Sequence, residues 1–145
     1  MPQPQWERYI LVVEDDRSLR ELYRWRLRAA GYAVIGVEDG LDALRVIDSS
    51  KPRAVVLDLA LPRLNGREVL AELRANVATQ HIPVVIVTGN DYSDLDPTQF
   101  ACVLTKPISP DQLAEAVEKC VSRLGLRAST SSDDSSRSRP RREDV

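Results

Sequence analysis

Residues 54–62 constrain the fold of this chain more than any other stretch. They read Ala-Val-Val-Leu-Asp-Leu-Ala-Leu-Pro, an unbroken apolar run that leads into the carboxylate of Asp58. A β-branched run of this kind predicts a strand buried on both faces, as in a parallel sheet. The carboxyl edge of an open α/β sheet is where binding sites form. We therefore expect Asp58 at that edge, either as a cap for the next segment or as a reactive group.

Four further apolar runs extend this pattern along the chain. The expected strands span residues 9–13, 33–37, 54–57, 83–89 and 100–104. Helical periodicity follows four of them, in stretches that begin near Asp16, Asp39, Gly66 and Ser109. The remaining connection, residues 90–99, is acidic, contains Pro97 and has weak helical periodicity. Alternation of this kind predicts an α/β fold with a doubly wound five-stranded parallel sheet and a shortened or irregular fourth helix.

Composition favours a single soluble domain. The 145 residues are 43% hydrophobic and 29% charged, which is enough to close one core. A net charge of -2 provides no electrostatic case for nucleic-acid or acidic-membrane binding. No signal-peptide pattern or long apolar segment is visible. We expect a cytoplasmic protein with a flexible segment at 1–8, a folded domain at 9–125, a disordered Ser/Arg-rich tail at 126–145, and neither a DNA-binding domain nor membrane contact.

Polar side chains follow four of the five expected strands. They are Glu14 and Asp15 after the first, Asp58 after the third, Thr88 at the end of the fourth and Lys106 after the fifth. The carboxyl ends of parallel strands meet at one edge, so these groups are expected together. Three clustered carboxylates need a cation, and oxygen ligands suit magnesium. With a lysine and a hydroxyl beside them, they match the needs of phosphoryl transfer.

Each of these residues also has an ordinary structural interpretation. Asp58 alone would cap a turn, Thr88 would be a β-branched strand residue bonded to backbone, and Lys106 would be solvated. A Glu-Asp-Asp run often starts a helix, and Asp16 is expected to cap the one that follows. The coincidence of all five groups at one edge favours a functional site, because clustered ionisable groups mark such sites.

Residues 9–124 resemble the receiver domain of bacterial two-component response regulators. The motifs that carry the resemblance are Glu14-Asp15 after a strand, Asp39-Gly40 before a helix, Asp58-x-x-x-Pro62-x-x-x-Gly66, Thr88-Gly89 and Lys106-Pro107. The resemblance implies a flavodoxin-like three-layer sandwich. It also implies a signalling switch that catalyses only its own phosphorylation and dephosphorylation, rather than a turnover enzyme.

The resemblance assigns a role to each residue of the acidic group. Asp58 would be the phosphoacceptor, forming an aspartyl phosphate. Asp15 would bind Mg2+ directly, Glu14 would bind it through water, and Asp58 together with the backbone carbonyl of Ala60 would complete the shell. These assignments come from matching positions in the motifs.

The resemblance also implies how the phosphoryl group is held and where it comes from. Thr88 and Lys106 would contact it, and the Lys106–Pro107 peptide bond would be cis. The donor would be a phosphohistidine on a histidine kinase or a histidine phosphotransfer protein. The output would be contact with a downstream protein target whose identity is unknown.

Two positions depart from the family pattern, and both concern output. Receivers usually carry Tyr or Phe three residues before the lysine, where this chain has Val103. Only 18 positions separate Thr88 from Lys106 (106 − 88 = 18), a few fewer than usual, and the loss falls in residues 90–99. We hypothesise that phosphorylation reshapes this segment instead of moving a helix and an aromatic ring.

Three functional interpretations follow. The first is a single-domain response regulator that accepts a phosphoryl group on Asp58 in a magnesium-dependent reaction and signals by protein contact. The second is an atypical receiver that works as a phosphorylation-independent docking module, supported by the divergent 90–104 segment. The third is a phosphatase of the haloacid-dehalogenase kind, which requires a second Asp two residues after the nucleophile. Ala60 occupies that position, so the third is disfavoured.

Overall fold

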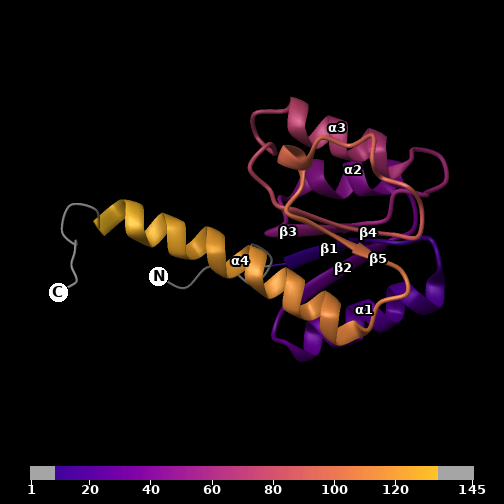
Figure 1. Cartoon of the computed structure of the whole chain (residues 1–145), viewed down its shortest axis with the longest axis horizontal. Coiled ribbons are helices and arrows are strands. Elements are labelled where there is room, and N and C mark those ends of the chain that lie inside the picture. Colours follow the sequence, from indigo (N-terminus) through magenta and orange to yellow (C-terminus); the bar gives the residue numbers. More distant parts are fainter. Residues whose placement is uncertain (1–8, 134–145) are drawn as a thin grey trace.

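The computed structural model describes residues 9–133, which form a five-stranded sheet between two helical layers (Figure 1). The strands are β1 (Tyr9–Val13), β2 (Ala33–Val37), β3 (Ala54–Leu57), β4 (Val84–Thr88) and β5 (Cys102–Thr105). All neighbouring pairs are parallel, in the order β2-β1-β3-β4-β5. The doubly wound α/β fold expected from the sequence is confirmed, with the fifth strand starting two residues later than predicted.

Two helices cover each face of the sheet. They are α1 (Arg17–Ala29), α2 (Gly40–Ser49), α3 (Gly66–Ala75) and α4 (Pro110–Asp133). Figure 1 shows α2 and α3 together on one face and α1 with the start of α4 on the other. The order of the strands reverses between β1 and β3, so the crevice outside their carboxyl ends is the expected place for a site.

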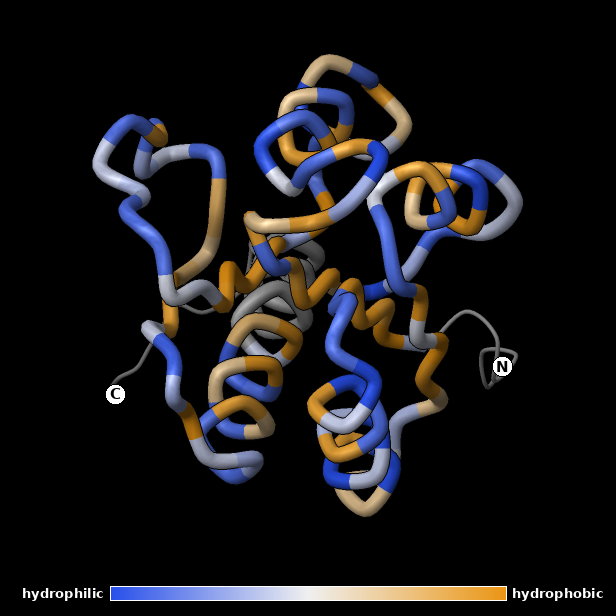
Figure 2. The backbone as a smooth tube through the Cα atoms, turned by 90° about the vertical axis from the view of Figure 1, so that its right-hand side faces the viewer, coloured by the Kyte–Doolittle hydropathy of each residue, from blue (hydrophilic) through white to orange (hydrophobic). Residues whose placement is uncertain are grey.

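The central strands are buried on both faces, as their apolar sequences predict. In β1, Ile10 and Val12 face the core beneath α1 and α4, whereas Leu11 and Val13 face the core beneath α2 and α3. All of β3 and β4 is buried in the same way. In Figure 2 these strands form a mostly hydrophobic centre, and the helices around them alternate between hydrophilic and hydrophobic residues. Two cores therefore fix the strand ends from both sides.

Side-chain caps define where the helices begin. Asp16, Asp39 and Asn65 each accept from a backbone amide in the first turn of α1, α2 and α3. Ser109 and Gln112 form a reciprocal capping box at the start of α4, as the sequence predicts. Because each helix starts directly after a strand-end loop, these caps also fix the loops that carry the polar groups.

The connection between β4 and β5 contains no α-helix. Its only helical piece is the short 3-10 helix η2 (Pro97–Gln99), so the predicted short or irregular fourth helix is confirmed. Leu95 and Phe100 lie partly buried against the core beneath α2 and α3. Arginines of α3 hold the two ends of this connection, because Arg67 donates to the carbonyl of Asp91 at 2.6 Å and Arg74 to that of Gln99 at 2.7 Å.

The last helix is longer than predicted. The sequence places its end at Gly125, but α4 continues to Asp133 and extends beyond the sheet (Figure 1). Glycine inside a helix costs only about 1 kcal/mol relative to alanine, and no proline follows until Pro140. The predicted end at Gly125 is therefore wrong. The expected flexible segment 1–8 and the rest of the expected tail, 134–145, lie outside the described residues. Among the residues described, no helix is long and apolar enough to cross a membrane.

Candidate functional site

Three carboxylates meet at the carboxyl ends of β1 and β3. Glu14 and Asp15 follow β1, Asp58 follows β3, and one ligand oxygen from each lies within 4.8 Å of the others. Glu14 and Asp58 are 2% and 5% exposed, whereas Asp15 is exposed to solvent. Such a group of hard oxygen donors, with one side open to water, can hold a divalent cation such as Mg2+.

Lys106 ties two of these carboxylates together. Its Nζ donates to Oε1 of Glu14 at 2.8 Å and to Oδ2 of Asp58 at 3.0 Å. The Lys106–Pro107 peptide bond is cis, as the resemblance implied. The backbone amide of Lys106 donates to the carbonyl of Thr88 at 2.9 Å, which attaches the end of β5 to the end of β4. The lysine therefore reaches across β4 to groups that follow β1 and β3.

The ion pairs set the protonation of the buried groups. Burial lowers the pKa of Lys106, but hydrogen bonds with Glu14 and Asp58 outweigh it and raise the pKa above its ordinary value. Lys106 therefore stays charged near neutral pH. Burial raises the pKa of Glu14, and the hydrogen bond from Lys106 opposes that increase. The lysine is the internal cation that allows two buried carboxylates to lie side by side.

Both carboxylate oxygens of Asp58 are held in place. Oδ2 accepts from Lys106, and Oδ1 accepts from the amide of Ala60 at 3.0 Å. The backbone of Asp58 is equally confined, because a Cβ on Gly66 would lie only 2.2 Å from its carbonyl oxygen. Gly66 thus allows the first turn of α3 to pack directly on the residue whose carboxylate faces the cluster. The carboxylate of Asp58 is therefore held in one orientation by its surroundings.

Thr88 lies at the same edge but is bonded differently. It is fully buried at the end of β4, and its Oγ1 accepts from the amide of Asn90 at 3.0 Å. The structure thus joins Glu14, Asp58 and Lys106 by hydrogen bonds and adds Asp15 to the acidic group. Thr88 is placed on the strand between them, with its hydroxyl engaged by the start of the β4–β5 connection.

Two contacts at the site were not foreseen. The resemblance implied a role for the carbonyl of Ala60, whereas in the structure its amide donates to Oδ1 of Asp58. A signal for it exists, since Asp side chains commonly accept from the amide two residues on. Nη1 of Arg20 donates to the carbonyl of Glu14 at 2.9 Å. No sequence pattern identifies that contact, which requires α1 to pack beside the end of β1.

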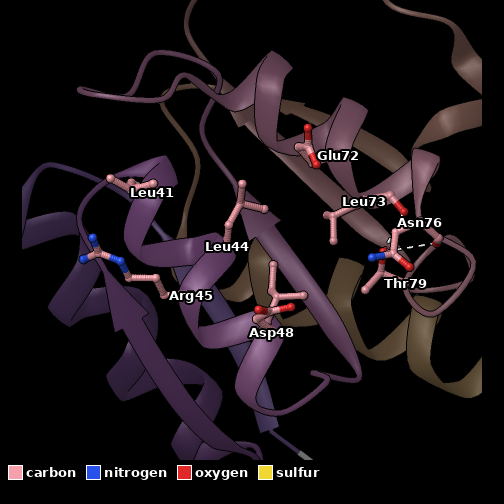
Figure 3. Close-up of a pocket in the computed structure, with 9 residues that line it drawn as sticks. Leu41, Leu44, Arg45, Asp48, Glu72, Leu73, Asn76 and Thr79 are labelled. Carbon is pink, nitrogen blue, oxygen red and sulfur yellow. Dashed lines mark hydrogen bonds between the residues drawn. The ribbon is translucent and has the colours of Figure 1, made fainter.

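A separate cavity of about 250 Å³ lies between α2 and α3. Figure 3 shows its lining side chains: Leu41, Leu44, Arg45 and Asp48 from α2, Glu72 and Leu73 from α3, and Asn76 and Thr79 after α3. The acidic cluster, which consists of Glu14, Asp15 and Asp58, does not line this cavity.

Comparison with known families gives an extended match. A family model described as the response regulator receiver domain matches residues 10–118. That range contains the five strands apart from Tyr9, the first residue of β1, and it includes the acidic cluster and Lys106. It stops inside α4, so the later part of this helix falls outside the family match.

Curated relatives match a shorter stretch. Response regulator MprA of Mycobacterium sp. (strain KMS) is 44% identical over 82 residues, which are 57% of this chain and 35% of that protein. Response regulator MprA of Mycolicibacterium vanbaalenii is 45% identical over a stretch of the same length. The match thus spans about a third of the length of these relatives.

Solved structures share the whole fold. The signal receiver domain of a Luxo repressor protein from Vibrio parahaemolyticus is 33% identical, with a TM-score of 0.75 over 83% of this chain and 95% of that one. The response regulator TrrA from Thermotoga maritima, solved in complex with Mg(2+)-BeF, is 30% identical, with a TM-score of 0.70 over 78% of this chain and 98% of that one. Both comparisons agree with the family match.

Proposed function

The chain belongs to the family of response regulator receiver domains, and on that premise we propose that it accepts a phosphoryl group on Asp58. Receiver domains are signalling domains of two-component systems, and response regulators interact with histidine kinases. The donor would be a phosphohistidine on a histidine kinase or a histidine phosphotransfer protein. The observation that carries this proposal is Lys106, whose Nζ binds Asp58 and Glu14 at once.

The proposed reaction transfers a phosphoryl group from a histidine nitrogen to the carboxylate of Asp58. A carboxylate oxygen of Asp58 attacks phosphorus, the bond between phosphorus and the histidine nitrogen breaks, and the imidazole leaves with that electron pair. The product is an acyl phosphate, which water later hydrolyses back to the carboxylate and inorganic phosphate. The charge of Lys106 would offset the negative charge on the transferring oxygens, and the hydroxyl of Thr88 would donate to one of them.

A divalent cation fits the donor set beside Asp58. Glu14, Asp15, Asp58 and the carbonyl of Ala60 would hold Mg2+, which would supply charge neutralisation for the phosphoryl oxygens. The oxygen atoms of the three carboxylates already lie within 4.8 Å of one another. The relative from Thermotoga maritima, solved with Mg(2+)-BeF, supports the choice of Mg2+. Asp15 is the most accessible ligand because it is the exposed member of the group.

We further propose that the receiver domain formed by this chain is a cytoplasmic switch that signals by contact with a downstream protein. Its only chemistry would be its own phosphorylation and dephosphorylation. A second candidate function is a docking module that binds partners without phosphorylation. The observation that favours it is the absence of an α-helix between β4 and β5, together with Val103 at the usual aromatic position.

One experiment separates the two functions. The protein would be incubated with acetyl phosphate and Mg2+, and its intact mass would be measured for the parent, Asp58→Asn and Asp48→Asn. Asp48 is an exposed aspartate on α2, outside the acidic cluster, so it controls for nonspecific phosphorylation of surface carboxylates. We expect one phosphate adduct on the parent and on Asp48→Asn and none on Asp58→Asn. An unmodified parent would support the docking module instead.

A further inference from the structure

The loop between β3 and α3 contains a γ-turn centred on Arg63. The amide of Leu64 donates to the carbonyl of Pro62 at 2.7 Å, and Arg63 has a φ of +63°. Within the described range 9–133, Arg63 is the one residue other than glycine with positive φ. A γ-turn with positive φ is rare and strained when its central residue carries a side chain. Interactions elsewhere must therefore hold Arg63 in this conformation.

Two carboxylates at the start of α2 hold the Arg63 side chain. Its Nε donates to Oδ2 of Asp39 at 2.8 Å, and its Nη2 lies 2.6 Å from the same oxygen. Nη2 also lies 3.3 Å from Oδ1 of Asp42. Asp39 is only 3% exposed, and its Oδ1 caps α2 by accepting from the amide of Asp42. Burial alone would raise the pKa of Asp39, but these hydrogen bonds outweigh it and lower the pKa below its ordinary value.

The backbone of this loop also touches α2 directly. A Cβ on Gly40 would lie 1.9 Å from the carbonyl oxygen of Leu64, so only glycine permits the approach. Elsewhere α2 and α3 pack through buried side chains such as Ile47 and Leu73, and both line the pocket of about 250 Å³ shown in Figure 3. The ion pair of Arg63 with Asp39 adds a charged contact between the loop and the start of α2.

The other end of the same loop carries the contact with the phosphoacceptor. The amide of Ala60 donates to Oδ1 of Asp58, and the carbonyl of Ala60 is the proposed metal ligand. Only Leu61 and Pro62 separate Ala60 from Arg63, and the ring of Pro62 fixes its φ. A displacement of the γ-turn is thus transmitted to Ala60 rather than absorbed by a flexible linker.

We propose that Arg63 is a positioning residue whose ion pair with Asp39 holds the γ-turn and thereby fixes Ala60 against Asp58. The consequence for phosphorylation rests on the proposed function, whereas the placement of Ala60 does not. In this arrangement the start of α2 is coupled to the acidic cluster through the β3–α3 loop. Removing either partner of the pair should loosen the same contact.

The test uses two variants that act on the pair from opposite sides. Arg63→Gly removes the guanidinium and also the strain, because glycine accepts positive φ. Asp39→Asn keeps a capping side chain on α2 but removes the charge. Arg45→Gln is the matched control, since Arg45 bonds the same oxygen of Asp42 that Arg63 approaches at 3.3 Å, whereas the Asp39 pair is made by Arg63. All would be measured as the full chain.

The first measurement is the amide resonance of Ala60 in metal-free protein. We expect it to move, and its hydrogen exchange to accelerate roughly tenfold, in Arg63→Gly and Asp39→Asn but not in Arg45→Gln. The second is Mg2+ affinity, which we expect to fall roughly tenfold in the same two variants, as is usual when a group supporting a ligand is removed. The double variant should lose no more than either single one, because both remove one interaction.

The opposite results would overturn the proposal. An unchanged Ala60 resonance with lowered thermal stability would make the pair a purely structural contact. Additive losses in the double variant would show that the two residues act separately. If the parent protein forms no phosphate adduct, the proposed function fails, but the Ala60 resonance in metal-free protein still decides whether Arg63 positions it.

Discussion

The acidic edge around Asp58 and the connection between β4 and β5 lie next to each other on the sheet, yet they are held in different ways. At the acidic edge, Glu14 and Asp58 are buried and share the ammonium group of Lys106. In the connection, Arg67 forms an exposed bidentate pair with Asp94, at 2.9 Å for both hydrogen bonds. Buried ion pairs hold the acidic edge, whereas an ion pair in contact with water holds the connection.

This difference indicates where the molecule can change shape. Hydrogen bonds in a low-dielectric interior are strong, whereas exposed ion pairs contribute little and exchange readily with water. Thr88 connects the two regions, because its hydroxyl accepts from the amide of Asn90 at the start of the connection. We therefore expect the acidic edge to keep its geometry and the connection to respond when a charged group is added to Asp58.

The largest effect is expected from Lys106→Met. Without the ammonium group, Glu14 and Asp58 are left as two buried carboxylates with no cation between them. Breaking a buried ion pair is strongly destabilising, and because Lys106 itself is 23% exposed we expect a loss of about 2 kcal/mol in the free energy of unfolding without Mg2+. Chemical denaturation with and without Mg2+ measures this loss.

Added Mg2+ should recover much of that stability, because a divalent cation replaces the missing positive charge. Lys119→Met is the control, since Lys119 is exposed on α4 and away from the cluster. A stability loss of the same size in Lys119→Met would contradict the idea that the acidic edge is held by its internal cation. So would a loss in Lys106→Met that added Mg2+ does not reduce.

A smaller effect is expected from Arg74→Met, which acts on the connection. Arg74 donates to the carbonyls of Gln80, Ile82 and Gln99, at 2.9, 2.8 and 2.7 Å. Leaving partly buried carbonyls without a donor should lower the free energy of unfolding by about 1 kcal/mol. Hydrogen exchange should accelerate at residues 99–101, while Mg2+ affinity stays that of the parent.

The same measurement on Arg28→Met provides the baseline, because Arg28 is an exposed arginine on α1. If Arg74→Met lowered the free energy of Mg2+ binding as much as the free energy of unfolding, the acidic edge and the connection would be coupled. Their separation into a rigid edge and a loosely held connection would then be incorrect.

The parts of the fold that sequence predicts well are those set by local pattern. Apolar runs such as residues 54–57 require burial on both faces, and a parallel sheet then brings Asp58 and Lys106 to one edge. The weak helix at 90–99 was predictable for the same reason, because Pro97 and the acidic composition oppose a helix there. Periodicity and turn chemistry carry this information within a few residues.

Contacts between distant side chains were not predictable in this way. The pairs of Arg63 with Asp39 and of Arg67 with Asp94 join residues from different elements, and each depends on how α2, α3 and the loops pack. The positive φ of Arg63 has no local signal, since glycine is the usual residue at such a position. The sequence predicts the end of α4 wrongly, because Gly125 resembles a helix end although a single glycine can be tolerated inside a helix.

The smallest expected effect, and the most direct test of the difference between the regions, is a set of chemical-shift changes. Addition of beryllofluoride and Mg2+ mimics the phosphoryl group on Asp58, and it should draw the hydroxyl of Thr88 away from the amide of Asn90. We expect the amide resonances of residues 90–99 to shift, and to shift further in Arg67→Gln, where the pair with Asp94 is lost. Large shifts at Val103 and in α4, with none in 90–99, would contradict this and show that the signal leaves through β5. We do not expect that result, because Val103 has no ring to turn and little rotamer freedom with which to transmit a signal.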